Sequence, residues 1–99
     1  MSTYYILRKA NGDILTIDVD GKTYIPVWDS ELGIRRSKLL DPGFVVYVPA
    51  VAERRLILRK FPTLNVPFFL VDSQGENLQV GREISQADLF DGSELAQAA

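Results

Sequence analysis

The sequence contains no cysteine and no histidine. The absence of cysteine excludes disulfides, thiolate metal sites and cysteine nucleophiles. Histidine is the commonest metal ligand and the only side chain whose ordinary pKa lies near neutrality, so its absence excludes imidazole bases and serine–histidine triads. Only carboxylates, lysine, tyrosine and serine remain for catalysis. We therefore expect a protein that is not an enzyme, and the sequence identifies no catalytic, metal-binding or cofactor-binding residue.

Long apolar runs are also absent. No stretch approaches the roughly 18 apolar residues that mark a membrane-spanning helix. The opening Met-Ser-Thr-Tyr-Tyr has neither the basic start nor the apolar core of a secretion signal. These absences predict a cytoplasmic protein that does not insert into a membrane. With 46% hydrophobic and 24% charged residues, the composition is typical of a single globular domain, here spanning residues 1–99.

Two turn dipeptides, Asn11-Gly12 and Asp20-Gly21, stand between short apolar runs. They predict a three-stranded antiparallel meander over residues 1–28. If each glycine takes the left-handed position of a three-residue loop, the first turn places Lys9 opposite Asp13. The two flanking strands then share an apolar face.

The register of the second turn depends on the length of its loop. A three-residue loop places Asp18 opposite Lys22, whereas a two-residue loop places Ile17 opposite Tyr24. We favour the three-residue loop, because it collects one apolar face from Tyr5, Leu7, Leu15, Ile17, Ile25 and Val27. The two-residue loop would move Ile25 and Val27 to the other face, since a slip of one residue reverses every side chain of a strand.

The rest of the chain predicts short helices and further strands. Asp29 or Ser30 can cap a helix that runs to about Leu40. We expect a buried strand over Phe44–Val48, while residues 50–60 fit either a helix that Pro49 begins or an alternating strand. Further predictions are a strand over 67–71, a turn over 73–76, a strand over 77–82, a helix after Ser85 and a short tail helix after Ser93.

These elements define an α+β fold in one compact domain, with an antiparallel sheet of about five strands and two or three short helices. Its segments are the β-meander of 1–28, a helix-strand-helix unit over 29–66, a β-hairpin over 67–82 and a C-terminal helical tail over 83–99. The second face of the meander is too apolar to lie in water, so a helix or a partner should cover part of it.

The strand that ends in Trp28 supplies the first candidate contact surface. Proline cannot donate to a strand ladder, so Pro26 predicts that this strand lies at a sheet edge, where large side chains are accessible. Tyr24, Pro26 and Trp28 are therefore candidate partner-binding residues. Trp28 could anchor an interface or pack beneath the following helix. We favour the core position for the indole and the surrounding edge for the contact.

The charges supply the second candidate surface. Residues 35–60 contain seven basic and two acidic side chains, a net charge of +5, and residues 61–99 contain one basic and six acidic side chains, a net charge of −5. The candidate binding residues are Arg54, Arg55, Arg59 and Lys60. This segment could bind an acidic partner or nucleic acid, or the two charged regions could be solvated faces that neutralise each other. The net charge of −2 disfavours nucleic acid.

The segment Asp20-Gly21-Lys22-Thr23-Tyr24-Ile25-Pro26-Val27-Trp28, followed by a polar helix start, resembles the opening of SseB-like domains and related uncharacterised bacterial families. The similarity continues with Phe61-Pro62-Thr63-Leu64, with the strand from Pro67 to Asp72, and with Ile84-Ser85. It spans about residues 4–90. These families are small α+β domains without established chemistry. The resemblance therefore implies an accessory or regulatory role and supplies no catalytic residue.

The sequence favours a non-enzymatic protein–protein interaction module, a small accessory or regulatory subunit of a larger assembly. This hypothesis depends on the second apolar face of the meander and on the separated charges. A nucleic-acid-binding protein that uses the basic segment of residues 35–60 is the alternative. An enzyme with a carboxylate or lysine site is the third hypothesis.

Overall fold

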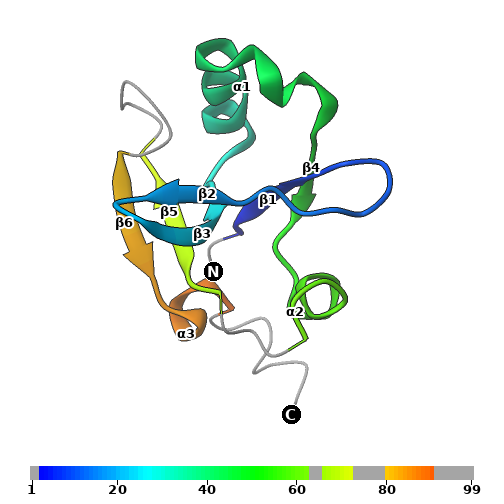
Figure 1. Ribbon diagram of the computed structural model, residues 1–99, viewed down its shortest axis with the longest axis vertical. Helices are drawn as coiled ribbons and strands as arrows, with labels where there is room; N and C mark the ends of the chain where they lie inside the picture. The colour runs from blue at the N-terminus through cyan, green and yellow to red at the C-terminus, as the bar shows by residue number, and fades with distance from the viewer. Residues whose placement is uncertain (1–2, 63–65, 73–79, 91–99) are drawn as a thin grey trace.

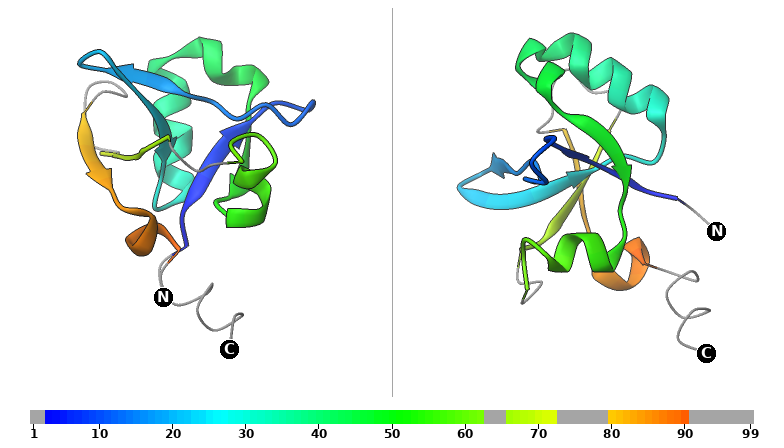
Figure 2. Two further views of the ribbon diagram at one scale, coloured as in Figure 1. Left: turned by 60° about the horizontal axis from the view of Figure 1, so that its bottom comes forward. Right: turned by 90° about the vertical axis from the view of Figure 1, so that its right-hand side faces the viewer.

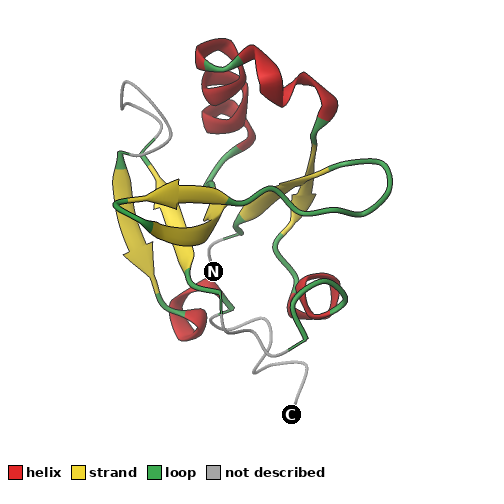
Figure 3. Cartoon of the chain, viewed as in Figure 1, coloured by secondary structure: helices red, strands yellow, loops and turns green. Residues whose placement is uncertain are grey.

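The computed structural model describes residues 3–62, 66–72 and 80–90 (Figure 1). Its strands are β1 (Tyr5–Arg8), β2 (Ile17–Val19), β3 (Lys22–Val27), β4 (Val48–Val51), β5 (Phe68–Val71) and β6 (Gly81–Ile84). Its helices are α1 (Glu31–Leu40), the 3-10 helix η1 (Pro42–Val46), α2 (Arg54–Leu58) and α3 (Gln86–Leu89). Figure 3 shows the strands across the middle of the molecule, with α1 and η1 at one end and α2 and α3 at the other.

The α+β fold class is confirmed, and the strands form two sheets. One sheet pairs β1 with β4, and the other has the order β2-β3-β5-β6. The pairing of β3 with β5 is parallel, whereas the sequence predicts an antiparallel sheet. Parallel neighbours need a long crossover connection. The chain between β3 and β5 supplies one, because it contains α1, η1, β4 and α2.

The first turn forms in the predicted register. Lys9 N donates to Asp13 O at 2.8 Å, and Gly12 N donates to Lys9 O at 2.9 Å. Gly12 has a φ of 95°, the left-handed conformation that a three-residue loop requires. A bridge between Arg8 and Ile14 continues the pairing. The regular ladder of β1 nevertheless forms with β4, so the meander is only partial.

The register predicted for the second turn is wrong. Ile17 lies opposite Tyr24, and Asp18 lies opposite Thr23. Asp20 and Gly21 have φ values of 53° and 80°, so both adopt the left-handed conformation of a two-residue type I′ loop. The twist of this turn matches that of the flanking strands, and aspartate tolerates the left-handed region.

The difference of one residue between the predicted and the observed register of β3 has a tertiary cause. The end of β3 is buried on both faces, because Ile25, Pro26 and Val27 and the following Trp28 are all buried. A strand buried on both faces has no polar side, so an argument that seeks one shared apolar face fails for it. Leu15 and Ile17 therefore lie with Trp28 on one side of the sheet, and the prediction that they share a face with Ile25 and Val27 is wrong.

Two clusters of buried side chains form the core. The Trp28 cluster comprises Leu7, Leu15, Trp28, Ile34, Phe44, Phe69 and Val71. The Phe68 cluster comprises Ile6, Ile14, Ile25, Val27, Ala52, Ile57, Phe68, Ile84, Leu89 and Phe90. The second face of the meander contributes Ile6 and Ile14 to the Phe68 cluster, which also contains Ile57 of α2. The chain itself therefore buries the apolar face that the sequence offered to a helix or a partner.

The prediction that Pro26 lies on an edge strand is also wrong, because β3 lies between β2 and β5. Ile25 N donates to Pro67 O beside β5, and Trp28 N donates to Tyr5 O on the other side of the strand. The nitrogen of Pro26 faces the same side as that of Trp28. It falls between the pairing of Tyr24 with Ile17 and that of Trp28 with Tyr5. A missing N–H costs no ladder hydrogen bond in that gap.

The helix starts agree with the sequence. Ser30 caps α1 by accepting from Gly33 N, and Ser85 caps α3 by accepting from Asp88 N, as short polar side chains do at a helix start. The strand over 67–71 appears as β5. The strand expected over 77–82 overlaps β6 only at residues 81–82, because β6 covers Gly81–Ile84 and ends two residues later than predicted. The turn over 73–76 and the tail helix after Ser93 lie outside the described residues.

The buried strand predicted over Phe44–Val48 is wrong. Asp41 Oδ1 accepts from Gly43 N at 3.0 Å, and Pro42 begins η1 with a dihedral angle suited to a helix start. Phe44 is buried, whereas Val45 and Val46 are exposed. Of the alternatives for residues 50–60, β4 extends to Val51 and the helix α2 covers Arg54–Leu58. The prediction that Pro49 begins the helix is wrong, because Pro49 lies within β4.

Candidate interaction surface

The structure does not bring the aromatic candidates together on an exposed surface. Pro26 and Trp28 are buried, so neither side chain can contact a partner while the domain is folded. The ring of Tyr24 lies 5.3 Å from that of Phe69, and its hydroxyl donates to Glu83 Oε1 at 3.1 Å. Desolvation and this hydrogen bond to a carboxylate raise the pKa of Tyr24. The contact edge predicted beside Trp28 is therefore absent from the described residues.

The basic candidates are exposed on and beside α2, but the chain already engages three of them. The guanidinium of Arg54 lies 5.1 Å from the centre of the Phe90 ring. Arg55 Nη2 lies 3.8 Å from Glu53 Oε2, and Lys60 Nζ lies 3.2 Å from Asp13 Oδ1. Arg59 is exposed. Exposed ion pairs of this kind contribute little to stability.

The bridge between Lys60 and Asp13 crosses a cavity of ≈ 410 Å³ between the first hairpin and the end of α2. Its lining residues are Lys9, Asp13, Ile14, Leu15, Thr16, Tyr47, Lys60 and Phe61. Hydrogen bonds from Lys60 and Asn11 and the positive charges of Lys60 and Lys9 lower the pKa of Asp13 below its ordinary value. The ion pair therefore links the hairpin to Lys60, which follows α2, at an exposed position.

We expect Lys60→Met to raise the pKa of Asp13 toward its ordinary value, as measured by NMR titration of the carboxyl carbon. A lowered pKa in the folded state stabilises the fold above the ordinary pKa, and this contribution is lost as the pH falls through the lowered value. The acid side of the stability profile should therefore become less steep in the variant. Lys9→Met is the matched control, and its effect should be smaller. An Asp13 pKa that does not change in Lys60→Met would contradict the bridge.

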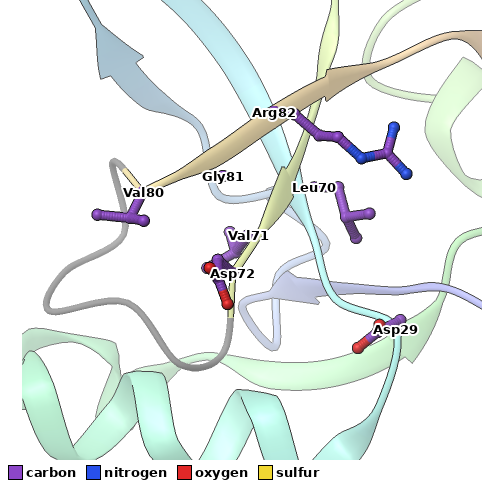
Figure 4. A pocket seen from close by; sticks show the side chains of 7 residues that line it. All are labelled: Asp29, Leu70, Val71, Asp72, Val80, Gly81 and Arg82. Carbon is purple, nitrogen blue, oxygen red and sulfur yellow. The ribbon is translucent and has the colours of Figure 1, made fainter.

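A second cavity, of ≈ 400 Å³, lies where β3 and β5 end (Figure 4). It is lined by Asp29, Leu70, Val71, Asp72, Val80, Gly81 and Arg82. Ligands often bind at the carboxyl ends of parallel strands, so the position is notable. Its charged groups are two carboxylates and one guanidinium. Among the described residues, no group of three or more acidic side chains is placed to hold a metal ion.

The most unusual surface lies at the opposite end of the molecule from α2 and α3 (Figure 1 and Figure 2). Five exposed aliphatic side chains follow one another where α1 turns into η1 and β4. They are Leu39 (84% exposed), Leu40 (51%), Val45 (78%), Val46 (59%) and Val48 (48%). We call these five residues the α1–η1 surface. Exposed apolar side chains that gather in one region of a protein mark interaction sites, whereas single exposed apolar residues do not.

Local structure explains why these side chains point outward. α1 ends at Leu40, and the N–H of the following Asp41 donates to Ser37 O while its side chain caps η1. The tight turn of η1 then buries Phe44 and leaves Val45 and Val46 outside. Lys38 Nζ donates to Tyr47 O at 2.8 Å and fixes η1 to α1. The surface is therefore held by hydrogen bonds at its base.

Exposed basic side chains adjoin the α1–η1 surface. Arg35 and Arg36 lie one turn before Leu39 on α1, and both are exposed. Within the described residues neither forms a salt bridge. The net charge of +5 over residues 35–60 is thus divided between α1 and α2, at opposite ends of the molecule, and does not form one basic surface.

Sequence reasoning missed this surface because it assigned Phe44–Val48 to a buried strand. The spacing of residues along α1 could have indicated this surface. Gly33, Ile34 and Ser37 lie on one face of the helix, which is buried. Leu39 lies on the opposite face and therefore points away from the core.

None of the described helices has the length and apolar character needed to cross a membrane.

Comparisons with known proteins add no family to this description. The resemblance to SseB-like domains stays a prediction. The chain matches no protein-family model, and a search of curated proteins finds no match.

Proposed function

We propose that this protein is a non-enzymatic protein–protein interaction module, a small accessory or regulatory subunit of a larger cytoplasmic assembly. The observation that carries the proposal is the α1–η1 surface. Leu39 and Val45 are 84% and 78% exposed, and an apolar surface of this kind gains free energy when a partner removes it from water. The SseB-like resemblance, which implies a small bacterial accessory domain, agrees with this role.

The partner should offer apolar groups next to acidic groups. Arg35 and Arg36 adjoin the α1–η1 surface and have no internal salt bridge among the described residues, so their charges are available to an acidic protein. Complementary charges of this kind raise the association rate and select the partner, while the apolar contact supplies most of the affinity. The interaction should weaken with salt but should not be abolished by it.

The two other hypotheses receive less support. A nucleic-acid-binding protein would need its cations on one surface, whereas α1 and α2 hold them at opposite ends. An enzyme needs reactive groups close together. The cavity of Figure 4 offers only carboxylates and an arginine, and in the cavity beside the first hairpin Lys60 is already paired with Asp13.

The test is partner capture from a nuclease-treated native lysate by the full chain and by two variants. Leu39→Glu with Val45→Glu places two charges in the α1–η1 surface. Ala87→Glu is the control, because Ala87 is exposed on α3 at the other end. We expect wild type and the control to retain the same protein and the double variant to lose it. With the purified partner, the loss of affinity should exceed about 30-fold, or about 2 kcal/mol.

Two results would contradict the proposal. If the double variant binds the partner as well as wild type does, the α1–η1 surface is not the contact. If nuclease removes all binding, and reversal of the charges of Arg54, Arg55 and Arg59 also removes it, the nucleic-acid hypothesis replaces the proposal. Circular dichroism and thermal melting of each variant establish that it is folded.

A further inference from the structure

The exposed side of α1 carries two leucines with two arginines between them. Leu32, Arg35, Arg36 and Leu39 stand at positions i, i+3, i+4 and i+7, which lie on one face of a helix. Leu32 is 73% exposed and Leu39 is 84% exposed, and both arginines are exposed. The two leucines are two turns apart, about 10.5 Å along the axis. We call these four residues the α1 stripe, which ends at the α1–η1 surface.

The α1 stripe is a rigid platform. The opposite face of α1 is buried through Gly33, Ile34 and Ser37. Ser37 Oγ accepts from Trp28 Nε1 at 2.9 Å, and Ile34 belongs to the Trp28 cluster. The N-cap of Ser30 fixes the start of the helix. Side chains presented from such a platform lose little backbone entropy on binding, which favours recognition by side-chain packing.

The neighbouring strand β4 is poorly suited to bind a partner by strand addition. Ala52 N donates to Tyr4 O, so the backbone nitrogens of alternate residues face β1, and those of Pro49 and Val51 face outward. Pro49 has no N–H to offer, and Val51 O already accepts from Glu53 N at 2.9 Å. Proline at an edge blocks the pairing of a further strand. The partner must therefore contact this end of the molecule through side chains.

We infer that the α1 stripe binds an acidic amphipathic helix of a partner protein; this deepens the proposed function and rests on it. An apolar residue repeated every seven positions on that helix packs against Leu32 and Leu39. Aspartate or glutamate between these apolar residues pairs with Arg35 and Arg36, whose guanidinium groups bind carboxylates in bidentate geometry.

A second copy of this chain is a poorer occupant. In a symmetric dimer through the α1 stripe, Arg35 and Arg36 of both copies would lie in the same interface. Like charges brought together in an interface oppose association. The charge of the stripe thus favours a partner of opposite sign.

The inference is tested by selection from a library of displayed helical peptides of about 14 residues, or four turns. The target is the full chain, and counter-selection uses Leu32→Gln with Leu39→Gln. We expect the enriched peptides to carry acidic residues beside apolar residues at i, i+3 or i+4, and i+7. Their affinity should fall at least about tenfold in the double variant and in Arg35→Gln with Arg36→Gln, and it should fall with added salt. Ala87→Gln is the matched control and should bind as wild type does.

Several outcomes would overturn the inference. Enrichment of basic peptides, of proline-rich extended peptides, or of peptides that bind the double variant equally well would do so. Dimerisation in light scattering that Leu39→Gln abolishes would assign the stripe to a second copy. Co-sedimentation with phosphatidylglycerol vesicles that the double variant loses would assign it to an anionic membrane.

The two levels of the proposal can fail separately. If the captured partner requires the α1–η1 surface but selection yields no acidic helix, the proposed function stands and this inference fails. If the partner binds the Leu39→Glu with Val45→Glu variant normally, the proposed function fails first.

Discussion

Replacing Trp28 with alanine is expected to lower the free energy of unfolding by about 3–5 kcal/mol, the range for removing a large aromatic side chain from a core. The indole is 1% exposed and belongs to the Trp28 cluster. Its Nε1 donates to Ser37 Oγ at 2.9 Å, and Ser37 is itself buried. The variant would lose this hydrogen bond and leave a cavity between the sheet and α1.

Urea unfolding followed by circular dichroism measures the effect, because the variant lacks the tryptophan that fluorescence would follow. Ser37→Ala is the matched control. It keeps the ring but leaves Nε1 without its partner, which should cost about 1–3 kcal/mol. A Trp28→Ala protein that is as stable as wild type but no longer binds its partner would show that the indole is an interface anchor. With the ring buried, binding should fail only through unfolding.

The second large effect is a contrast between two residues of α1. Ile34→Ala should cost about 2–5 kcal/mol of stability, since Ile34 is 2% exposed and packs in the Trp28 cluster. Leu39→Ala should change stability by no more than about 0.5 kcal/mol, because the Leu39 side chain is 84% exposed. The order should reverse for partner binding, where Leu39→Ala weakens the complex.

The same two variants give a direct check on the role of the α1–η1 surface. Thermal melting and partner affinity are measured on each sample. If Leu39→Ala destabilises the fold as much as Ile34→Ala does, Leu39 contributes to the core, and the surface is smaller than the structure shows. If both variants are as stable as wild type, the packing of α1 against the sheet does not stabilise the fold.

Features that depend on a few neighbouring residues could be predicted from the sequence. Asn11-Gly12 fixed its own loop because a glycine at a φ of 95° suits only a few turns. Ser30 and Ser85 start helices because a side-chain oxygen can reach an N–H two or three residues later. The apolar run of β5 also lies where its composition indicates. None of these features requires knowledge of what packs against it.

The register of β3 could not be predicted in this way. The sequence permits two loops at Asp20-Gly21, and the choice depends on which face of β3 is buried. Because β5 pairs with β3 and the core lies on both of its sides, the usual alternation of polar and apolar residues is absent. The edge position predicted from Pro26 is wrong for a related reason. A central strand can contain a proline where its nitrogen falls between the pairings with two neighbouring strands, as it does between Ile17 and Tyr5.

The same distinction between local and tertiary features applies to the candidate site. The sequence by itself determined the composition of the chain, its first turn, its helix starts and the absence of histidine and cysteine chemistry, because these properties are local or compositional. Only the tertiary structure decided that Trp28 is buried, that the basic residues separate to two ends, and that Leu39 and Val45 are exposed. Burial depends on contacts between residues far apart in the chain, and those contacts form only when the sheet and α1 pack together.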